Sequence, residues 1–147
     1  YLTEISAQQS SWLEETLASN KTKPTLIFFH APLAGTLAQY NKEVNTPNFI
    51  AQPEKQLHKL LIKNPQILLW VSGHTHTPAT NPSFDETINL YEGKILDLHN
   101  PTLDGKIIWK NSIYLYPDKI SIRTFNHNTG EFVESLDRTL PVNLAAK

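Results

Sequence analysis

The feature that most constrains the fold of this chain is a short apolar run that ends in two histidines. Residues 67–72 are almost entirely apolar, and Gly73-His74-Thr75-His76 follows them directly. A run of this length, preceded by Asn64-Pro65 and closed by a glycine, predicts a buried β-strand. Because side chains two residues apart point to the same side of an extended chain, we expect both imidazoles to lie together at the strand end. Imidazole is the commonest protein ligand for transition metals. A metal site and an ordinary polar loop are both compatible with the motif alone.

A second apolar run has a similar ending. Residues 25–29 lead into His30-Ala31-Pro32. Proline has no backbone N–H and restricts the residue before it, so a strand should end here with His30 at its carboxyl end. The predicted order of helix, strand, helix and strand indicates parallel strands covered by helices. In such sheets ligands bind beyond the carboxyl ends of the strands, where His30, His74 and His76 all lie, and this position favours the metal site.

Two segments are predicted to be helices. In residues 6–20, Ser6 is a suitable N-cap, with Gln9 as its partner in a capping box. The second helix is expected over residues 53–64, where a proline occupies the first turn. Helical spacing assigns six apolar residues to the core: Trp12, Leu13 and Leu17 in the first helix, and Leu57, Leu60 and Leu61 in the second.

The connection between the first strand and the second helix is long. Residues 33–49 are polar and rich in turn-forming residues, so we expect a surface loop that serves as a lid or a binding loop. Two further histidines stand apart from the strand ends. His58 lies on the second predicted helix and His127 lies in a predicted hairpin turn. Their spacing relates neither of them to the other histidines, so both are expected to be solvated.

The chain changes character after Thr77. Short apolar segments separated by turn residues predict strands, over residues 95–98, 106–109, 112–116, 119–125 and 132–133. The alternation of Ile120, Ile122 and Thr124 is typical of a half-buried antiparallel strand. Residues 140–147 are expected to form a loosely ordered tail. The whole pattern predicts one α/β domain spanning residues 1–147.

Composition excludes several classes of function. The 147 residues carry a formal net charge of −1, so no basic surface indicates binding to nucleic acid. No apolar run approaches the roughly 20 residues of a membrane span, and we expect a soluble protein of undetermined compartment. The chain has no cysteine, so a metal must be held by His, Asp, Glu or Asn. The sequence begins at Tyr1 and contains no methionine, so we expect a processed or truncated chain.

The two strand ends that carry the histidines resemble the last two motifs of the calcineurin-like metallophosphoesterases. Phe28-Phe29-His30-Ala31-Pro32 is similar to their lone-histidine motif, and Ser72-Gly73-His74-Thr75-His76 is similar to their Gly-His-x-His motif. Residues 9–17 resemble the helix that precedes the first of these motifs, and Asn100-Pro101-Thr102 resembles an Asn-x-Pro-Ser-like segment. Residues 122–138 look like the closing hairpin of the bacterial phosphodiesterase-like branch. The resemblance covers nearly the whole chain, as the C-terminal part of such a domain.

The resemblance implies a fold and a chemistry. The family fold is a four-layer α/β/β/α sandwich, and this chain would be its C-terminal half, with parallel strands and helices followed by antiparallel strands. Two metal ions, commonly Mn, Fe, Zn or Ni, are bridged by an aspartate and a hydroxide. By resemblance, His30 and His74 bind one ion and His76 binds the other. Such a centre hydrolyses a phosphomonoester or phosphodiester without a protein nucleophile, so no catalytic residue is expected beyond the metal ligands. The resemblance names neither the substrate nor its binding residues.

The chain also departs from the family. The Asp-x-His, Gly-Asp-x-x-Asp and Gly-Asn-His-Asp/Glu motifs that supply the other ligands do not occur before His30. Asp97-Leu98-His99 does spell Asp-x-His, but it follows the Gly-His-Thr-His motif. We interpret it as a chance match within a strand; a permuted set of ligands is the alternative.

Two hypotheses follow. In the first, the chain is part of a metallophosphoesterase that needs the missing N-terminal half. Alone it should be nearly inactive, hold its metals at partial occupancy at most, and self-associate through an exposed apolar sheet face. In the second, the chain is a stand-alone α/β binding or interaction module whose three histidines hold one metal ion weakly, as three histidines hold zinc.

Overall fold

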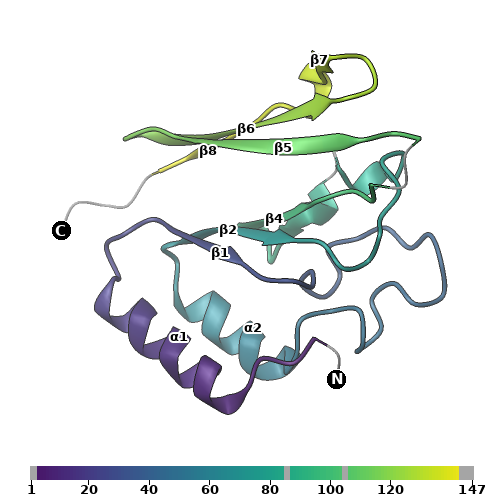
Figure 1. Ribbon diagram of the computed structural model, residues 1–147. Helices are drawn as coiled ribbons and strands as arrows, with labels where there is room; N and C mark the ends of the chain where they lie inside the picture. Colours follow the sequence, from purple (N-terminus) through teal and green to yellow (C-terminus); the bar gives the residue numbers. More distant parts are fainter. Residues whose placement is uncertain (1–2, 85–86, 104–105, 143–147) are drawn as a thin grey trace.

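The computed structural model describes residues 3–84, 87–103 and 106–142. Its elements form three layers, with two α-helices below a mixed sheet and an antiparallel sheet above it (Figure 1). This order of layers matches the predicted α/β class, with parallel strands and helices first and antiparallel strands after them. In the described part of the chain, no α-helix covers the outer face of the antiparallel sheet, so a fourth layer is not seen.

The first sheet has the strand order β1-β2-β4-β3. Strands β1 (Thr25–Phe28), β2 (Ile67–Ser72) and β4 (Ile95–His99) are parallel, and the short β3 (Leu90–Tyr91) is antiparallel to β4. At the carboxyl ends, Phe28 is paired with Val71, and Ser72 with His99. The three parallel strands therefore end side by side, as the apolar runs predicted for β1 and β2. The place of β4 as a third parallel strand was not predicted.

Helices α1 (Ala7–Ser19) and α2 (Glu54–Lys63) pack on one face of this sheet. The predicted capping box of Ser6 and Gln9 is present at the start of α1. Leu17 is buried and Leu13 packs against the core, but Trp12 is 65% exposed. The assignment of Trp12 to the core is therefore wrong. The i, i+4 pair of Leu13 and Leu17 defines the buried stripe, and Trp12 lies outside it.

The second sheet packs on the other face of the first, and its strands are antiparallel. It consists of β5 (Trp109–Leu115), β6 (Lys119–Asn126), β7 (Glu131–Phe132) and β8 (Arg138–Pro141). Short 3-10 helices, η1 (Pro82–Phe84), η2 (Thr87–Asn89) and η3 (Glu134–Leu136), lie in the connections. The core between the sheets joins Leu69 and Val71 to Ile120 and Ile122. The alternation predicted for β6 is confirmed.

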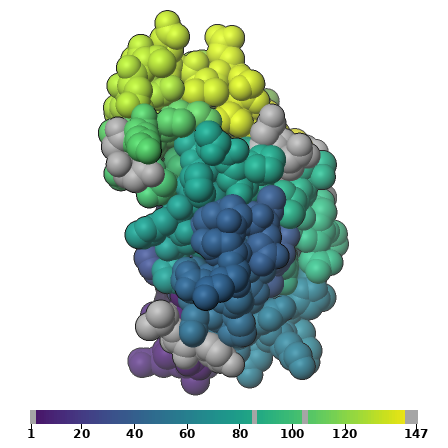
Figure 2. Space-filling model, turned by 90° about the vertical axis from the view of Figure 1, so that its right-hand side faces the viewer, coloured from purple at the N-terminus to yellow at the C-terminus, as the bar shows by residue number. Residues whose placement is uncertain are grey.

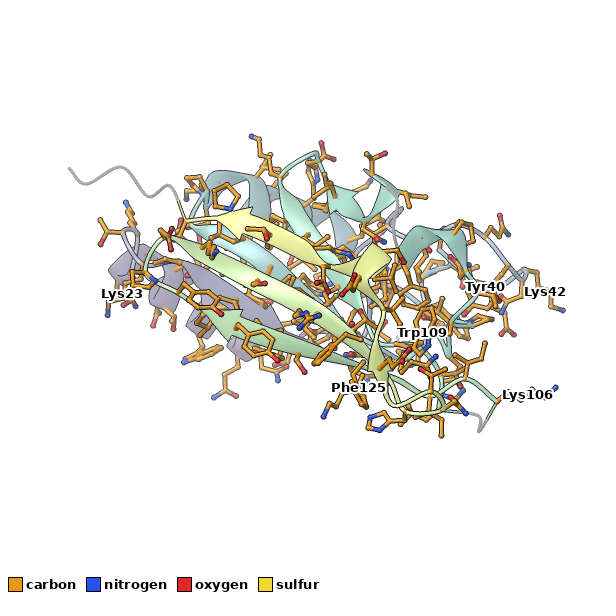
Figure 3. The ribbon with its side chains drawn as sticks, turned by 90° about the horizontal axis from the view of Figure 1, so that it is seen from above. Lys23, Tyr40, Lys42, Lys106, Trp109 and Phe125 are labelled. Carbon is orange, nitrogen blue, oxygen red and sulfur yellow. The ribbon has the colours of Figure 1, made fainter. Side chains whose placement is uncertain are left out.

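Two boundaries in the second sheet differ from the prediction. Two strands were expected over residues 106–109 and 112–116, but a single strand, β5, pairs with β6 from Trp109 to Leu115, and residues 106–108 precede it without strand structure. Leu140 and Pro141 belong to β8, and Leu140 pairs with Ile120, so these two residues are not part of a loose tail as expected. Residues 143–147 of that tail lie outside the described residues. Figure 3 shows this sheet from above, with Lys23 at one end of the molecule and Tyr40 and Lys42 at the other.

Candidate metal site at the strand ends

The chain that follows β1 closes the carboxyl end of the first sheet. Residues 30–52 contain no helix or regular strand, as the prediction of a long loop required. This loop occupies the middle of the face seen in Figure 2. Hydrogen bonds from β2 and the turn after it hold the first two residues of the loop. The carbonyl oxygen of His30 accepts from the N–H of Gly73 (3.0 Å), and that of Ala31 accepts from the indole N–H of Trp70 (2.9 Å). His30 is thereby held beside the turn that carries His74.

His30 and His74 form a pair. Nε2 of His30 lies 2.9 Å from Nδ1 of His74, and the ring centroids are 4.6 Å apart. The other nitrogen of His74, Nε2, lies 3.0 Å from the carbonyl oxygen of Asn48. Because a carbonyl oxygen only accepts, Nε2 must carry the proton, and Nδ1 of a neutral ring then presents its lone pair to His30. This is the arrangement of a metal-binding histidine, whose second ring nitrogen donates to a carbonyl group.

His76 does not join this pair in the structure. His74 and His76 both adopt positive φ angles, 65° and 48°, and β2 ends at Ser72. The expectation of an extended backbone that presents both imidazoles together is therefore wrong. His76 is exposed, and no group of three potential ligands forms within the described ranges. Its role as a ligand of a second metal stays a prediction. Left-handed backbone at non-glycine residues is costly and often marks functional sites.

The loop also supplies aromatic groups to the site. The ring of Phe49 lies 5.1 Å from that of His74, and the hydroxyl of Tyr40 donates to the carbonyl oxygen of Thr75. Asn48, Phe49 and Tyr40 were not singled out by the sequence because they are 25 or more positions from the residues they contact. Only the length of the loop indicated that it would serve the site.

The Asp-x-His match in β4 lies in a second, enclosed cluster. Asp97 and His99 are 0% and 2% exposed. Ser72 Oγ lies between them, 2.7 Å from Oδ1 of Asp97 and 3.0 Å from Nδ1 of His99. His99 Nε2 donates to the carbonyl oxygen of Thr36 (3.0 Å). Both ring nitrogens of His99 therefore have protein partners, which supports the interpretation that this match is not a pair of metal ligands.

Burial raises the pKa of Asp97 above its ordinary value of 3.8. The nearby His99 and the hydrogen bonds from Leu33, Ser72 and Thr36 act in the opposite direction without cancelling that effect. The sequence shows Asp97 as an exception to the apolar pattern of its strand. It does not show which residues bond to this carboxylate, because they lie far away in the chain.

The remaining two candidate histidines differ from each other. His127 is exposed beside the turn after β6, as predicted. The His58 side chain is 38% exposed, so it is solvated in part as expected, but its Nδ1 also lies 2.8 Å from the hydroxyl of Tyr91. Helix α2 packs against the end of the first sheet and brings the two residues together. Burial, then Glu92 and Glu54, raise the pKa of Tyr91 to about 12.

Comparison with known proteins identifies the fold. No family model matches the sequence, and no curated protein matches it. A dimetal phosphatase from Danio rerio has a similar structure, with a TM-score of 0.62 and 16% sequence identity. The match covers 95% of this chain but only 39% of that phosphatase chain. The chain therefore has the α/β fold of one part of this phosphatase. Among the described helices, none is long and apolar enough to cross a membrane.

Proposed function

We propose that this chain is part of a metal-dependent phosphoester hydrolase in which His30 and His74 bind one metal ion and His76 binds a second. The observation that carries the proposal is the His30–His74 pair, with 2.9 Å between facing nitrogens and the proton of His74 held on Nε2 by Asn48. The fold shared with a dimetal phosphatase supports the same chemistry. The substrate is a phosphomonoester or a phosphodiester.

The roles of the chain's own residues follow from their positions. His30 Nε2 and His74 Nδ1, which face each other across one hydrogen bond, would be the atoms that bind the metal, and the Asn48 carbonyl group keeps the proton of His74 on Nε2. Bound metal ions of this kind, Mn, Fe, Zn or Ni, activate water and neutralise the charge that develops on a phosphoryl group. No side chain of this chain is then needed as a nucleophile.

A two-metal site needs more ligands than the described residues bring together. Two sheet edges on the surface could bind a further part of the protein that supplies them. Among the described strands, β1 and β5 each lie at an edge of their sheet, and Phe28 and Leu115 on these strands are 69% and 67% exposed. Exposed apolar side chains at an unpaired sheet edge favour association. We propose that a further, N-terminal part of the protein packs here and contributes a bridging carboxylate. The isolated chain should then be nearly inactive and should self-associate, which Phe28→Lys should reduce in light scattering.

Metal content is the direct test of the site. The chain is incubated with Mn or Zn, dialysed exhaustively and assayed by mass spectrometry, alongside His30→Ala, His74→Ala and His127→Ala. His127 is an exposed histidine outside the site and serves as the matched control. We expect partial occupancy in the unchanged chain and in His127→Ala, and loss of the metal in the other two variants. Equal metal content in all four proteins would refute the assignment of the ligands.

The alternative is a non-catalytic binding module with a weak metal site. The observation that favours it is that only two imidazoles meet within the described ranges. Phosphoester hydrolysis by the full-length protein separates the two functions, because a binding module retains the metal without turnover. Loss of that hydrolysis in His74→Ala, but not in His127→Ala, would support the hydrolase.

A further inference from the structure

We propose that the buried carboxylate of Asp97 is a positioning group that sets the separation of His30 and His74. One of its oxygens holds the chain just after His30, and the other holds the end of the strand just before His74. This inference rests on the proposed function for the meaning of the two histidines, but its geometry is independent of any bound metal.

Oδ2 of Asp97 holds the loop that follows His30. It accepts the backbone N–H of Leu33 at 2.6 Å and the hydroxyl of Thr36 at 2.8 Å. The carbonyl oxygen of Thr36 also accepts from His99 Nε2 (3.0 Å) and from the amide of Asn89 (3.1 Å). Two points of one loop are thus attached to one carboxylate oxygen, and the turn over residues 33–36 is fixed against β4.

Oδ1 of Asp97 holds the other ligand-bearing segment. It accepts the hydroxyl of Ser72, the last residue of β2, at 2.7 Å. Only Gly73 separates Ser72 from His74. The two oxygens of a single carboxylate therefore connect the chain after His30 to the chain before His74.

Proton counting shows how the cluster is satisfied. Ser72 Oγ contacts Asp97 Oδ1 and His99 Nδ1, and Thr36 Oγ1 contacts Asp97 Oδ2 and the carbonyl oxygen of Leu33. Each hydroxyl carries one proton, so each donates to one of its two partners at a time.

Burying the Asp97 carboxylate in an apolar strand costs folding free energy, which suggests that the side chain has a role. Strands of parallel sheets that are covered on both faces are normally apolar throughout, and the neighbours of Asp97 in β4 are Leu96 and Leu98. A carboxylate that is 0% exposed loses its hydration and depends on protein partners. Within the described residues, its hydrogen-bond donors are Leu33, Thr36 and Ser72, which lie on the two segments that carry His30 and His74.

The test compares Asp97→Ala with Asp97→Asn. Alanine leaves Leu33, Thr36 and Ser72 without their common acceptor, whereas asparagine presents an oxygen to the loop and an N–H to Ser72. We expect Asp97→Ala to weaken Zn binding about 10- to 100-fold, as loss of a group that orients a metal ligand does, and Asp97→Asn to restore most of the affinity. Similar Zn affinities for the alanine variant and the unchanged chain would overturn the proposal.

A milder pair of variants covers the case in which Asp97→Ala does not fold. Thr36→Val removes one hydroxyl from the loop side of the carboxylate. Thr124→Val removes an equally buried hydroxyl in β6, which donates to Asn111. We expect Thr36→Val to weaken Zn binding and Thr124→Val to leave it unchanged, while both lose similar stability in urea. Equal Zn affinities in the two variants would show a purely structural role.

A metal-free measurement separates this inference from the proposed function. Ring-nitrogen NMR of the folded chain without metal should show the His74 proton on Nε2 and a hydrogen bond between His30 and His74. In Asp97→Ala, or in Thr36→Val, both histidines should move toward the tautomer mixture of free imidazole. If the unchanged chain binds no Zn but these spectra change as expected, the metal function fails and the positioning role stands. If the spectra do not change, the positioning role fails.

Discussion

Two histidine clusters lie at the carboxyl end of the first sheet, and burial distinguishes them. His99 is 2% exposed and both of its ring nitrogens contact protein groups, Ser72 and Thr36. His30 is exposed, and its Nε2 contacts Nδ1 of His74, which is itself a candidate ligand. The same side chain at neighbouring strand ends is enclosed by protein groups in one case and open to solvent in the other.

Because of this difference, substitutions in the enclosed cluster should lower stability, whereas substitutions in the exposed pair should lower metal binding. Removing a fully bonded, enclosed side chain leaves polar partners without hydrogen bonds and opens a cavity, so the loss appears in stability. Removing an exposed side chain that is a candidate ligand changes the fold little, so the loss appears in metal binding. Substitutions in the two clusters should therefore separate stability from binding.

The largest effect is expected for His99→Ala. The substitution leaves Ser72 Oγ and the Thr36 carbonyl oxygen short of a partner, and we expect the free energy of unfolding to fall by about 2–4 kcal/mol. His30→Ala should change it by about 0.5 kcal/mol or less. Urea unfolding followed by circular dichroism measures both. Equal losses in the two variants would remove the distinction between the clusters.

A smaller effect is expected from pH. Burial raises the pKa of Asp97 in the folded chain above 3.8, so the folded state binds the proton more tightly than the unfolded state does. The stability that this group contributes is present below that value and is lost as pH rises through the folded-state pKa. Asp97→Asn lacks this titration, so its stability relative to the unchanged chain should increase from acid toward neutral pH. A constant difference in urea unfolding across that range contradicts the expected direction.

The smallest effect is expected at Tyr91, the partner of the half-buried His58. His58 contacts the hydroxyl of Tyr91, whose pKa is raised to about 12 by burial and then by Glu92 and Glu54. The stability that depends on the neutral phenol is therefore present below pH 10.0 and lost as pH rises toward about 12. Glu92→Gln should lower the pKa of Tyr91 slightly, as measured by tyrosinate absorbance. An unchanged or higher value would show that Glu92 does not act on this group.

The main outline of the fold was predictable from local patterns. The apolar runs before His30 and His74 predicted β1 and β2, and the alternation of Ile120 and Ile122 predicted the inner face of β6. These predictions succeed because strand period and the common ends of parallel strands are local rules. They also brought His30 and His74 to one edge of the sheet.

The remaining features depend on contacts between distant parts of the chain. Asn48 is 26 positions from His74, and Leu33 is 64 positions from Asp97. No periodicity indicates such pairs. The exposure of Trp12 and the left-handed backbone of His76 likewise follow from how helices and turns pack in three dimensions.

The central claim is that the exposed pair binds metal and the enclosed cluster does not. Titration of the chain with Zn, followed by ring-nitrogen NMR of all six histidines, tests it most directly. We expect Nε2 of His30 and Nδ1 of His74 to shift together while His99 and His127 stay unchanged. Shifts at His99, or shifts spread equally over exposed histidines such as His127, would contradict the account.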